Sequence, residues 1–254
     1  MVWDSPGFLD LPARPGKPRS AGVTHVLDRG VPVPYLEAVL TQAGDLVDVL
    51  KIGWGTAYVD PAAKDRAMLC RSAGITLCLG GTLLEICYAQ DKVDQLVEWA
   101  NGIGVAAVEV SDGLCAIGRD RKAELIRRLS TDFTVLAETG AKDSTVPVVA
   151  ADWVDEMESD LAAGARWVVV EGRESGTVGL YHPDGSLRTE LIEEIQTRLP
   201  VDRVIFEAPR KPQQVWLIDH FGPQVNLGNI PLEDALAVET LRLGLRADTA
   251  RVHR

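Results

Sequence analysis

The sequence predicts an α/β protein built as a single (β/α)8 barrel of the TIM type. From Thr24 onward, about eight short apolar segments alternate with segments whose apolar residues recur at helical spacing. No linker or shift in composition interrupts the alternation, and 254 residues is close to the ~250 that one such barrel needs. An open doubly wound sheet is the alternative, but it would need fewer units or a second domain, and no glycine-rich nucleotide-binding motif follows the first predicted strand.

Each predicted element follows from its local pattern. Residues 167–170 are consecutive apolar residues, which suits a strand buried on both faces of a parallel sheet. Glycines such as Gly74 and Gly164 mark the ends of predicted helices, because glycine readily adopts the left-handed conformation found there. The other predicted strands are 25–28, 47–52, 75–79, 105–110, 134–138, 203–207 and 224–227. The predicted helices are 35–43, 62–73, 83–101, 121–129, 151–163, 189–198, 213–220 and 232–243.

The N-terminal segment differs from the rest of the chain. It contains Pro6, Pro12, Pro15 and Pro18, and proline disrupts both helices and central strands because it lacks the backbone N–H donor. We therefore predict an extended arm over residues 1–22, lying on the barrel or on a neighbouring subunit, and a catalytic barrel domain over residues 23–254.

Composition limits the class of protein. The formal net charge of -11 argues against a nucleic-acid partner, which normally requires a basic surface. No apolar run reaches the ~18 residues of a membrane span, and residues 1–20 lack the apolar core of a secretory signal. The cysteines show no metal-binding or disulfide spacing and are expected to be free thiols; they are Cys70, Cys78, Cys87 and Cys115. These features predict a cytoplasmic protein without nucleic-acid or membrane partners.

Polar residues follow most of the predicted strands, and in a closed barrel these strand ends meet on one face. The carboxylates are Asp28, Glu109, Asp112, Glu138, Glu171, Glu174 and Glu207. The cations are Lys51, Lys142 and Arg173, with Arg210 and Lys211 just beyond. Carboxylates in such number require a cation among them, and a set of oxygen ligands favours Mg²⁺. The lysines and the arginine indicate an anionic substrate, because arginine binds phosphate or carboxylate through paired hydrogen bonds.

Some of these residues have structural alternatives. Glu109 could instead pair with Lys51 inside the barrel, and Asp28 could cap the turn at Gly30. Glu174 could form an outward salt bridge. Trp54 and Trp167 fit packing in the core or at the rim better than stacking on a substrate.

Seven motifs carry a family resemblance. They are 51–56 (KIGWGT), 80–85 (GGTLLE), 108–113 (VEVSDG), 171–176 (EGRESG), 206–209 (FEAP), 226–230 (NLGNI) and 241–249 (LRLGLRADT). In this order they resemble the phosphosulfolactate synthase family over nearly the whole chain from residue 24 to residue 249. The resemblance implies a barrel that adds sulfite to phosphoenolpyruvate with Mg²⁺, giving (2R)-phospho-3-sulfolactate, the first step of one route to coenzyme M. It also implies a homo-oligomer, expected as a trimer.

The strand ends and the resemblance together give each candidate residue an expected role. Lys142 is the expected proton donor, with Lys51 as the second candidate. The expected magnesium ligands are Glu138, Glu171, Glu207 and Asp112. The expected substrate-binding residues are Arg173, Gly80, Gly81, Thr82, Ser111, Asn226 and Asn229.

One position departs from the family pattern. The family usually has Glu-Val-Gly-Lys-Lys after its fifth strand, whereas this chain has Glu138-Thr139-Gly140-Ala141-Lys142. The chemistry is retained if Lys142 matches the catalytic lysine. The wider family also includes a plant heat-stress-associated protein, so two alternatives stay open. One is a barrel that acts on another phosphorylated or carboxylated anion, and the other is a non-catalytic stress-associated or interaction protein.

Overall fold

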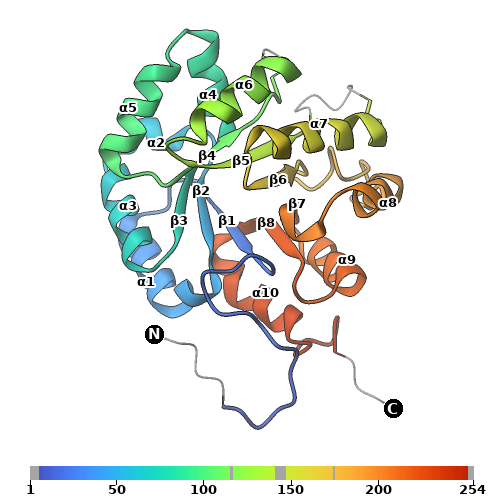
Figure 1. Cartoon of the computed structure of the whole chain (residues 1–254). Coiled ribbons are helices and arrows are strands. Elements are labelled where there is room, and N and C mark those ends of the chain that lie inside the picture. Colours follow the sequence, from blue (N-terminus) through green and yellow to red (C-terminus); the bar gives the residue numbers. More distant parts are fainter. Residues whose placement is uncertain (1–5, 115–116, 141–146, 174, 251–254) are drawn as a thin grey trace.

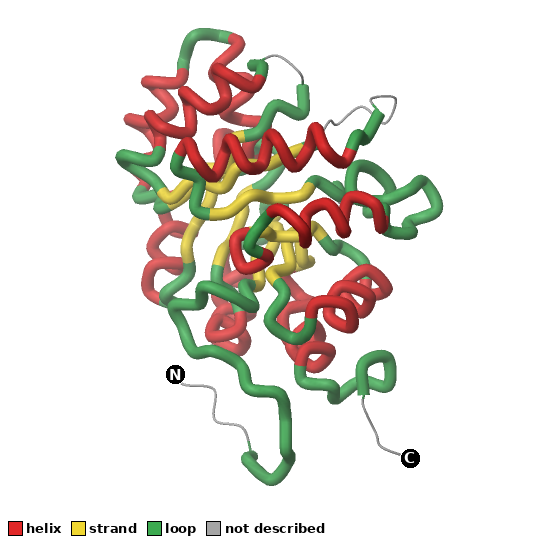
Figure 2. The backbone as a smooth tube through the Cα atoms, turned by 45° about the vertical axis from the view of Figure 1, so that its right-hand side comes forward, coloured by secondary structure: helices red, strands yellow, loops and turns green. Residues whose placement is uncertain are grey.

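The computed structural model describes residues 6–114, 117–140, 147–173 and 175–250. In these residues eight parallel strands close into one barrel in sequence order, and β8 pairs with β1. The helices surround the strands, as Figure 1 shows along the barrel and Figure 2 shows from a view turned by 45°. The predicted closed TIM barrel is confirmed.

The bounds of the elements are close to the predicted ranges. The strands are β1 Thr24–Asp28, β2 Val49–Ile52, β3 Thr76–Leu79, β4 Ala107–Val110, β5 Thr134–Thr139, β6 Trp167–Val170, β7 Val204–Glu207 and β8 Asn226–Pro231. The α-helices are α1 Val33–Ala43, α2 Thr56–Val59, α3 Ala63–Ser72, α4 Gly81–Ala89, α5 Val93–Ile103, α6 Arg119–Leu129, α7 Ala150–Ala163, α8 Thr189–Arg198, α9 Lys211–Phe221 and α10 Ala235–Arg242. Short 3-10 helices are η1 Gly44–Leu46, η2 Val201–Arg203 and η3 Leu232–Asp234. Among the described helices, none has the length and apolar character needed to cross a membrane.

The short helix α2 was not predicted, and the helix predicted over 232–243 begins as the 3-10 helix η3. Two further differences have a clear physical reason. The single helix predicted over 83–101 is two helices, α4 and α5, because Asp91 adopts a left-handed backbone conformation (φ 55°) that a continuing helix does not allow. The strand predicted over 224–227 is β8, which begins at Asn226 and continues to Pro231. Asn226 therefore starts its strand instead of lying near the end of it.

Two separate groups of buried apolar side chains stabilise the barrel. The larger group fills the layer between the strands and the surrounding helices. The smaller group lies inside the barrel and consists of Val23, Val49, Cys78, Ala107, Leu136, Trp167, Val169 and Ile205. Because successive side chains of a strand point to opposite faces, the strands β2 to β7 contribute to both groups.

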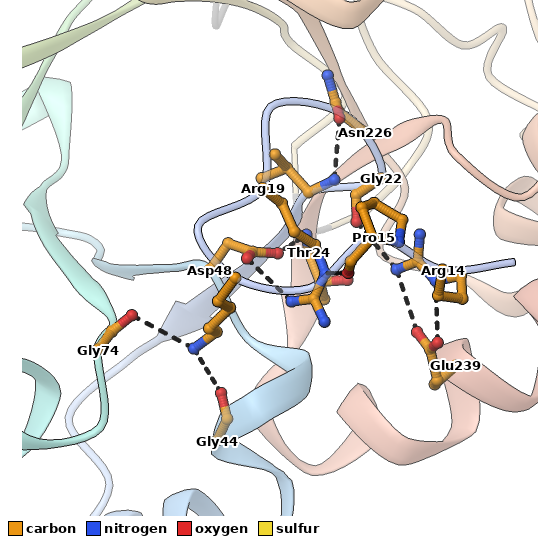
Figure 3. Close-up of polar contacts among 12 residues, drawn as sticks. Arg14, Pro15, Arg19, Gly22, Thr24, Gly44, Asp48, Gly74, Asn226 and Glu239 are labelled. Atoms are coloured by element: carbon orange, nitrogen blue, oxygen red, sulfur yellow. Dashed lines mark hydrogen bonds and ion pairs between the residues drawn. The ribbon is translucent and has the colours of Figure 1, made fainter. Parts of the chain in front are cut away.

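The N-terminal arm packs against the end of the barrel at which the strands begin, opposite to the strand ends that carry the predicted site. Its described part, residues 6–22, contains no helix or strand. Figure 3 shows Arg14 reaching Glu239 of α10 (Nε to Oε1, 2.9 Å) and Arg19 reaching Asp48 ahead of β2 (Nη1 to Oδ1, 3.0 Å). Lys17 Nζ donates to the Gly44 carbonyl oxygen at 2.7 Å. The arm therefore joins elements from the first and the last quarter of the chain.

Asn226 belongs to the same end of the barrel. Its Oδ1 accepts a hydrogen bond from the Val23 N–H (2.9 Å, Figure 3), and its Nδ2 donates to the Val204 carbonyl (3.0 Å). These bonds align the starts of β8, β1 and β7. The expectation that Asn226 lies in the substrate pocket is thus corrected, because the strand register places this residue at the opposite end of β8.

Arg242, at the end of α10, is buried beside these strand starts. Its guanidinium donates to the carbonyl oxygens of Pro223 (2.8 Å), Val225 (2.6 Å) and Val23 (3.1 Å). Burial lowers the pKa of this guanidinium to about 9, so its charge is stabilised only by the groups around it.

Arg242→Met should lower the free energy of unfolding by about 3 kcal/mol, because a buried polar group left without a partner costs about 1–3 kcal/mol. Urea denaturation measures this difference. Arg127→Met is a matched control on the exposed side of α6, with an expected change within about 0.5 kcal/mol. Equal changes in the two variants would contradict a structural role for the Arg242 hydrogen bonds.

Candidate active site

A layer of charged side chains covers the apolar interior of the barrel at the end where the strands stop. On five strands an apolar residue of the interior is followed, two positions later, by a charged residue that lines one pocket. The pairs are Val49 and Lys51, Ala107 and Glu109, Leu136 and Glu138, Val169 and Glu171, and Ile205 and Glu207. Because side chains alternate along a strand, each pair points inward together. The chain thereby places one ammonium and four carboxylates at the mouth of the barrel.

Lys51 lies at the centre of this charged layer. Its Nζ is 3.0 Å from Glu109 Oε2, 3.2 Å from Glu207 Oε1 and 3.7 Å from Glu138 Oε2. Burial alone would lower the pKa of this lysine, but the surrounding carboxylates outweigh burial and raise the pKa well above its ordinary value. Lys51 is therefore a fixed positive charge, and the pairing with Glu109 proposed from the sequence is confirmed.

Glu138, Glu171 and Glu207 form a buried cluster that can hold a metal ion. One oxygen from each lies within 4.8 Å of the others. Burial, together with the charges of Glu138 and Glu207, raises the pKa of Glu171 well above its ordinary value. A cation among these oxygens would relieve that repulsion. The donor set consists only of carboxylate oxygens, which fits a hard divalent ion such as Mg²⁺ better than zinc.

Glu109 is a fourth buried carboxylate, and it bridges two strand ends. While Oε2 accepts from Lys51, Oε1 accepts from the backbone N–H of Gly81 at the start of α4 (2.9 Å). Burial, and next the nearby charge of Glu138, raises the pKa of Glu109 to about 6. Glu109 therefore occupies a backbone donor that the sequence suggested for a substrate anion.

The turn after β6 is fixed by Glu207 and Tyr181. Glu207 Oε2 accepts from the N–H groups of Gly172 (2.8 Å) and Arg173 (3.0 Å). The hydroxyl of Tyr181, which is fully buried, donates to the Glu207 carbonyl at 2.5 Å. A side chain at Gly172 would come within 2.6 Å of the Tyr181 ring, so only glycine fits there. This arrangement holds Arg173 at the rim of the pocket with a left-handed backbone (φ 54°).

Most of the site residues expected from the sequence line this one pocket. They are Lys51, Gly80, Gly81, Thr82, Glu138, Glu171, Arg173, Glu207 and Asn229. The pocket has a volume of about 220 Å³. The Oδ1 atom of Asn229 is buried and has no hydrogen-bond partner among the described residues, which leaves an acceptor beside the pocket.

Other expected residues lie elsewhere. Asp112 accepts hydrogen bonds from the N–H groups of Ile117 and Gly118 (both 2.8 Å), so it shapes the loop after β4 and does not belong to the carboxylate cluster. The Ser111 hydroxyl donates to Glu85 behind the pocket wall. Lys142, Ala141, Glu174 and Cys115 lie outside the described residues.

Sequence reasoning missed two features of this pocket. Tyr181 gave no signal, because its position in the long segment between β6 and α8 follows only from the folded loop. Trp54 was assigned to packing, yet it lines the pocket and is 56% exposed. By contrast, Asp28 caps the turn as proposed, since its Oδ1 accepts from Gly30 N–H at 2.8 Å.

The sequence of the chain matches one family over most of its length. The model for (2R)-phospho-3-sulfolactate synthase (ComA) matches residues 12–248. A phosphosulfolactate synthase of Bacillus subtilis is 37% identical over 244 residues, which cover 95% of this chain and 97% of that protein. A phosphosulfolactate synthase of Methanothermobacter thermautotrophicus is 40% identical over 244 residues, which cover 94% and 95%.

Solved structures share the barrel at much lower identity. The crystal structure of 3-hexulose-6-phosphate synthase has a TM-score of 0.57 at 12% identity and covers 90% of this chain and 94% of its own. The structure of phosphonopyruvate hydrolase with oxalate and Mg²⁺ has a TM-score of 0.52 at 13% identity, covering 85% and 77%. At these identities the likeness shows the fold alone.

Lys51→Met should destabilise the metal-free protein by about 3–5 kcal/mol near neutral pH, because it leaves buried carboxylates without their counter-ion. The loss should be smaller at about pH 5 than at about pH 8. Without the ammonium, the folded-state pKa of Glu109 rises further above its unfolded value. The stability that such a carboxyl contributes is present below the unfolded pKa and is lost as the pH rises through the folded pKa.

Urea denaturation in a chelating buffer at several pH values measures this difference. Lys64→Met, at an exposed position of α3, is the matched control and should change stability little at any pH. A Lys51→Met effect that does not depend on pH would contradict the electrostatic account.

Proposed function

The chain belongs to the (2R)-phospho-3-sulfolactate synthase family, and from this premise we propose that its pocket joins sulfite to phosphoenolpyruvate. The observation that carries the proposal is the buried cluster of Glu138, Glu171 and Glu207 in the same pocket as Arg173. A cation on the carboxylates and a guanidinium in the same pocket suit a small substrate with two anionic groups. The volume of about 220 Å³ also suits a small ligand, since the pockets that bind drug-sized ligands measure roughly 300–1,000 Å³.

We propose Mg²⁺ as the cofactor, held by Glu138, Glu171 and Glu207. When bound, the ion would stabilise negative charge that develops on the carboxylate of phosphoenolpyruvate. Lys51 would keep Glu207 and Glu109 in place from the centre of the barrel. Because the Lys51 ammonium is already engaged by carboxylates, its contacts support a positioning role more than the delivery of a proton.

In the proposed reaction the sulfur of sulfite forms a bond to C3 of phosphoenolpyruvate. The electron pair of the C2–C3 double bond moves toward C2 and the carboxylate, and C2 then takes up a proton. No group leaves, so the product is (2R)-phospho-3-sulfolactate with its phosphate intact. We assign the proton to Lys142, which the family pattern places after β5, and the binding of an anionic substrate group to Arg173.

A direct assay tests this function. Purified protein with Mg²⁺, phosphoenolpyruvate and sulfite should consume phosphoenolpyruvate and release phosphosulfolactate, identified by mass spectrometry, and omission of sulfite should stop the reaction. Lys142→Ala should lower turnover by at least about 100-fold, the usual contribution of a general acid, while calorimetry still detects phosphoenolpyruvate binding. Unchanged turnover would remove Lys142 from the mechanism. Binding without any turnover in the unaltered protein would favour the non-catalytic alternative.

The proposed ligand set predicts that Glu171 and Asp112, both expected from the sequence to bind Mg²⁺, differ in their effect on metal affinity. Glu171→Gln should weaken Mn²⁺ binding by at least about 100-fold, because loss of a partner outside the ligand shell already costs about 10–100-fold. Asp112→Asn should leave the affinity unchanged, since Asp112 bonds to loop N–H groups. Electron paramagnetic resonance titration of Mn²⁺ measures both affinities without reference to activity. Equal weakening in the two variants would contradict the assigned ligand set.

A further inference from the structure

Backbone strain in this chain is concentrated at the pocket. Among the described residues, four that are not glycine have a left-handed φ: Trp54 (57°), Asp91 (55°), Arg173 (54°) and Asn229 (50°). Three of the four line the pocket: Trp54 and Arg173 lie in the turns after β2 and β6, and Asn229 lies within β8. The left-handed conformation costs a bulky residue about 1–2 kcal/mol, and such strain occurs mainly where function requires it.

Trp54 is the least expected of these residues. It lies in the turn between β2 and α2, next to Gly55, which is also left-handed (φ 68°). The residue is 56% exposed, so burial of apolar surface does not explain the presence of a large aromatic side chain. Glycine would fit the same backbone without strain. A side chain that is strained, exposed and adjacent to a pocket points to a role in binding.

The indole of Trp54 holds a positive charge at the mouth of the pocket. The guanidinium carbon of Arg29, after β1, lies 5.4 Å from the centre of the Trp54 ring, a cation–π contact. Arg29 is exposed, and among the described residues no carboxylate forms an ion pair with it. Arg29 is therefore a cation whose charge is still available to a ligand.

The two sides of the pocket have different charge. The carboxylates that line it come from β4 to β7, whereas β8, β1, β2 and β3 contribute the uncharged groups Leu27, Gly53, Trp54, Gly80, Gly81, Thr82 and Asn229, apart from Lys51. Lys51 is engaged by Glu109 and Glu207. On the first side Arg173, after β6, is the cation that lines the pocket. On the second side the Lys51 ammonium is already paired, so a second oxyanion bound there needs another cation. Arg29 does not line the pocket itself, but it contacts Trp54, which does.

We propose that Trp54 and Arg29 form an oxyanion-binding element at the mouth, in which the indole orients the guanidinium toward the ligand. The proposal rests on the proposed function and adds to it a specificity determinant. The oxyanion is either the phosphate group of phosphoenolpyruvate or sulfite, and the two sources are distinguished by which Michaelis constant changes.

Trp54→Gly is the decisive variant, because it removes the indole and relieves the left-handed strain at once. Its thermal stability should be equal to or higher than that of the unaltered protein, so lost binding cannot be ascribed to misfolding. We expect the KM for one of the two substrates to rise about tenfold or more, which corresponds to the loss of a well-placed charged contact, with kcat changed less than about threefold. Arg29→Gln should raise the same KM and reduce the dependence of kcat/KM on ionic strength.

Asp91→Gly is the matched control, since Asp91 has nearly the same φ but lies between α4 and α5 and does not line the pocket. It should leave both KM values unchanged. If Trp54→Gly also leaves both unchanged, the proposal is wrong.

The test does not depend on success of the proposed function. If the unaltered protein shows no sulfite-dependent turnover, calorimetry with phosphoenolpyruvate and with sulfite as separate probes replaces the kinetic assay. Weaker binding of either probe by Trp54→Gly and Arg29→Gln, but not by Asp91→Gly, would then support the element while the proposed reaction fails. Equal binding in all variants would overturn the element itself.

Discussion

The contacts of one buried ammonium group organise the mouth of this barrel. The Nζ of Lys51 on β2 lies 3.0 Å from Glu109 on β4 and 3.2 Å from Glu207 on β7. These strands are not neighbours in the sheet, so the charge connects them across the barrel and not along the hydrogen-bonded ladder. Charges buried in this way are stabilised mainly by one another, and removal of one leaves the others without their counter-ion.

The remaining contacts show which carboxylates have few hydrogen-bond donors or positive charges near them. Glu109 receives the Gly81 N–H in addition to Lys51, and Glu207 receives two N–H groups from the turn after β6. Glu138 and Glu171 face each other with fewer donors, and this repulsion contributes, after burial, to the raised pKa of Glu171. This balance of charge supports the proposed cation site between Glu138 and Glu171, with Glu207, which its N–H donors already orient, as the third proposed ligand.

The sequence was sufficient for the fold and for most of the residues that line the pocket, because both depend on local patterns. Alternation along each strand decides which side chains point inward, and barrel closure brings the strand ends together. It was not sufficient where tertiary contacts decide. Asn226 was expected in the pocket but lies at the opposite end of the barrel, because pairing with the neighbouring strands sets the register of β8. Asp112 was expected to bind metal but accepts hydrogen bonds from N–H groups of its own loop. Likewise, nothing in the sequence showed that Glu109 would take the N–H of Gly81.

Around the pocket, some glycines are explained by packing, whereas some large residues stand where the backbone favours glycine. At Gly53, Gly172 and Gly228 an added side chain would lie within 3.0 Å of a neighbouring side chain, so packing alone accounts for these glycines. Trp54 and Arg173 have the opposite pattern, since their backbone favours glycine but a large side chain is present. Glycine at either position would relieve the strain of the left-handed backbone in the folded state. The side chains themselves must therefore account for their presence. Both line the pocket that contains the buried carboxylates, which is where the proposed anionic substrate would need a positive charge.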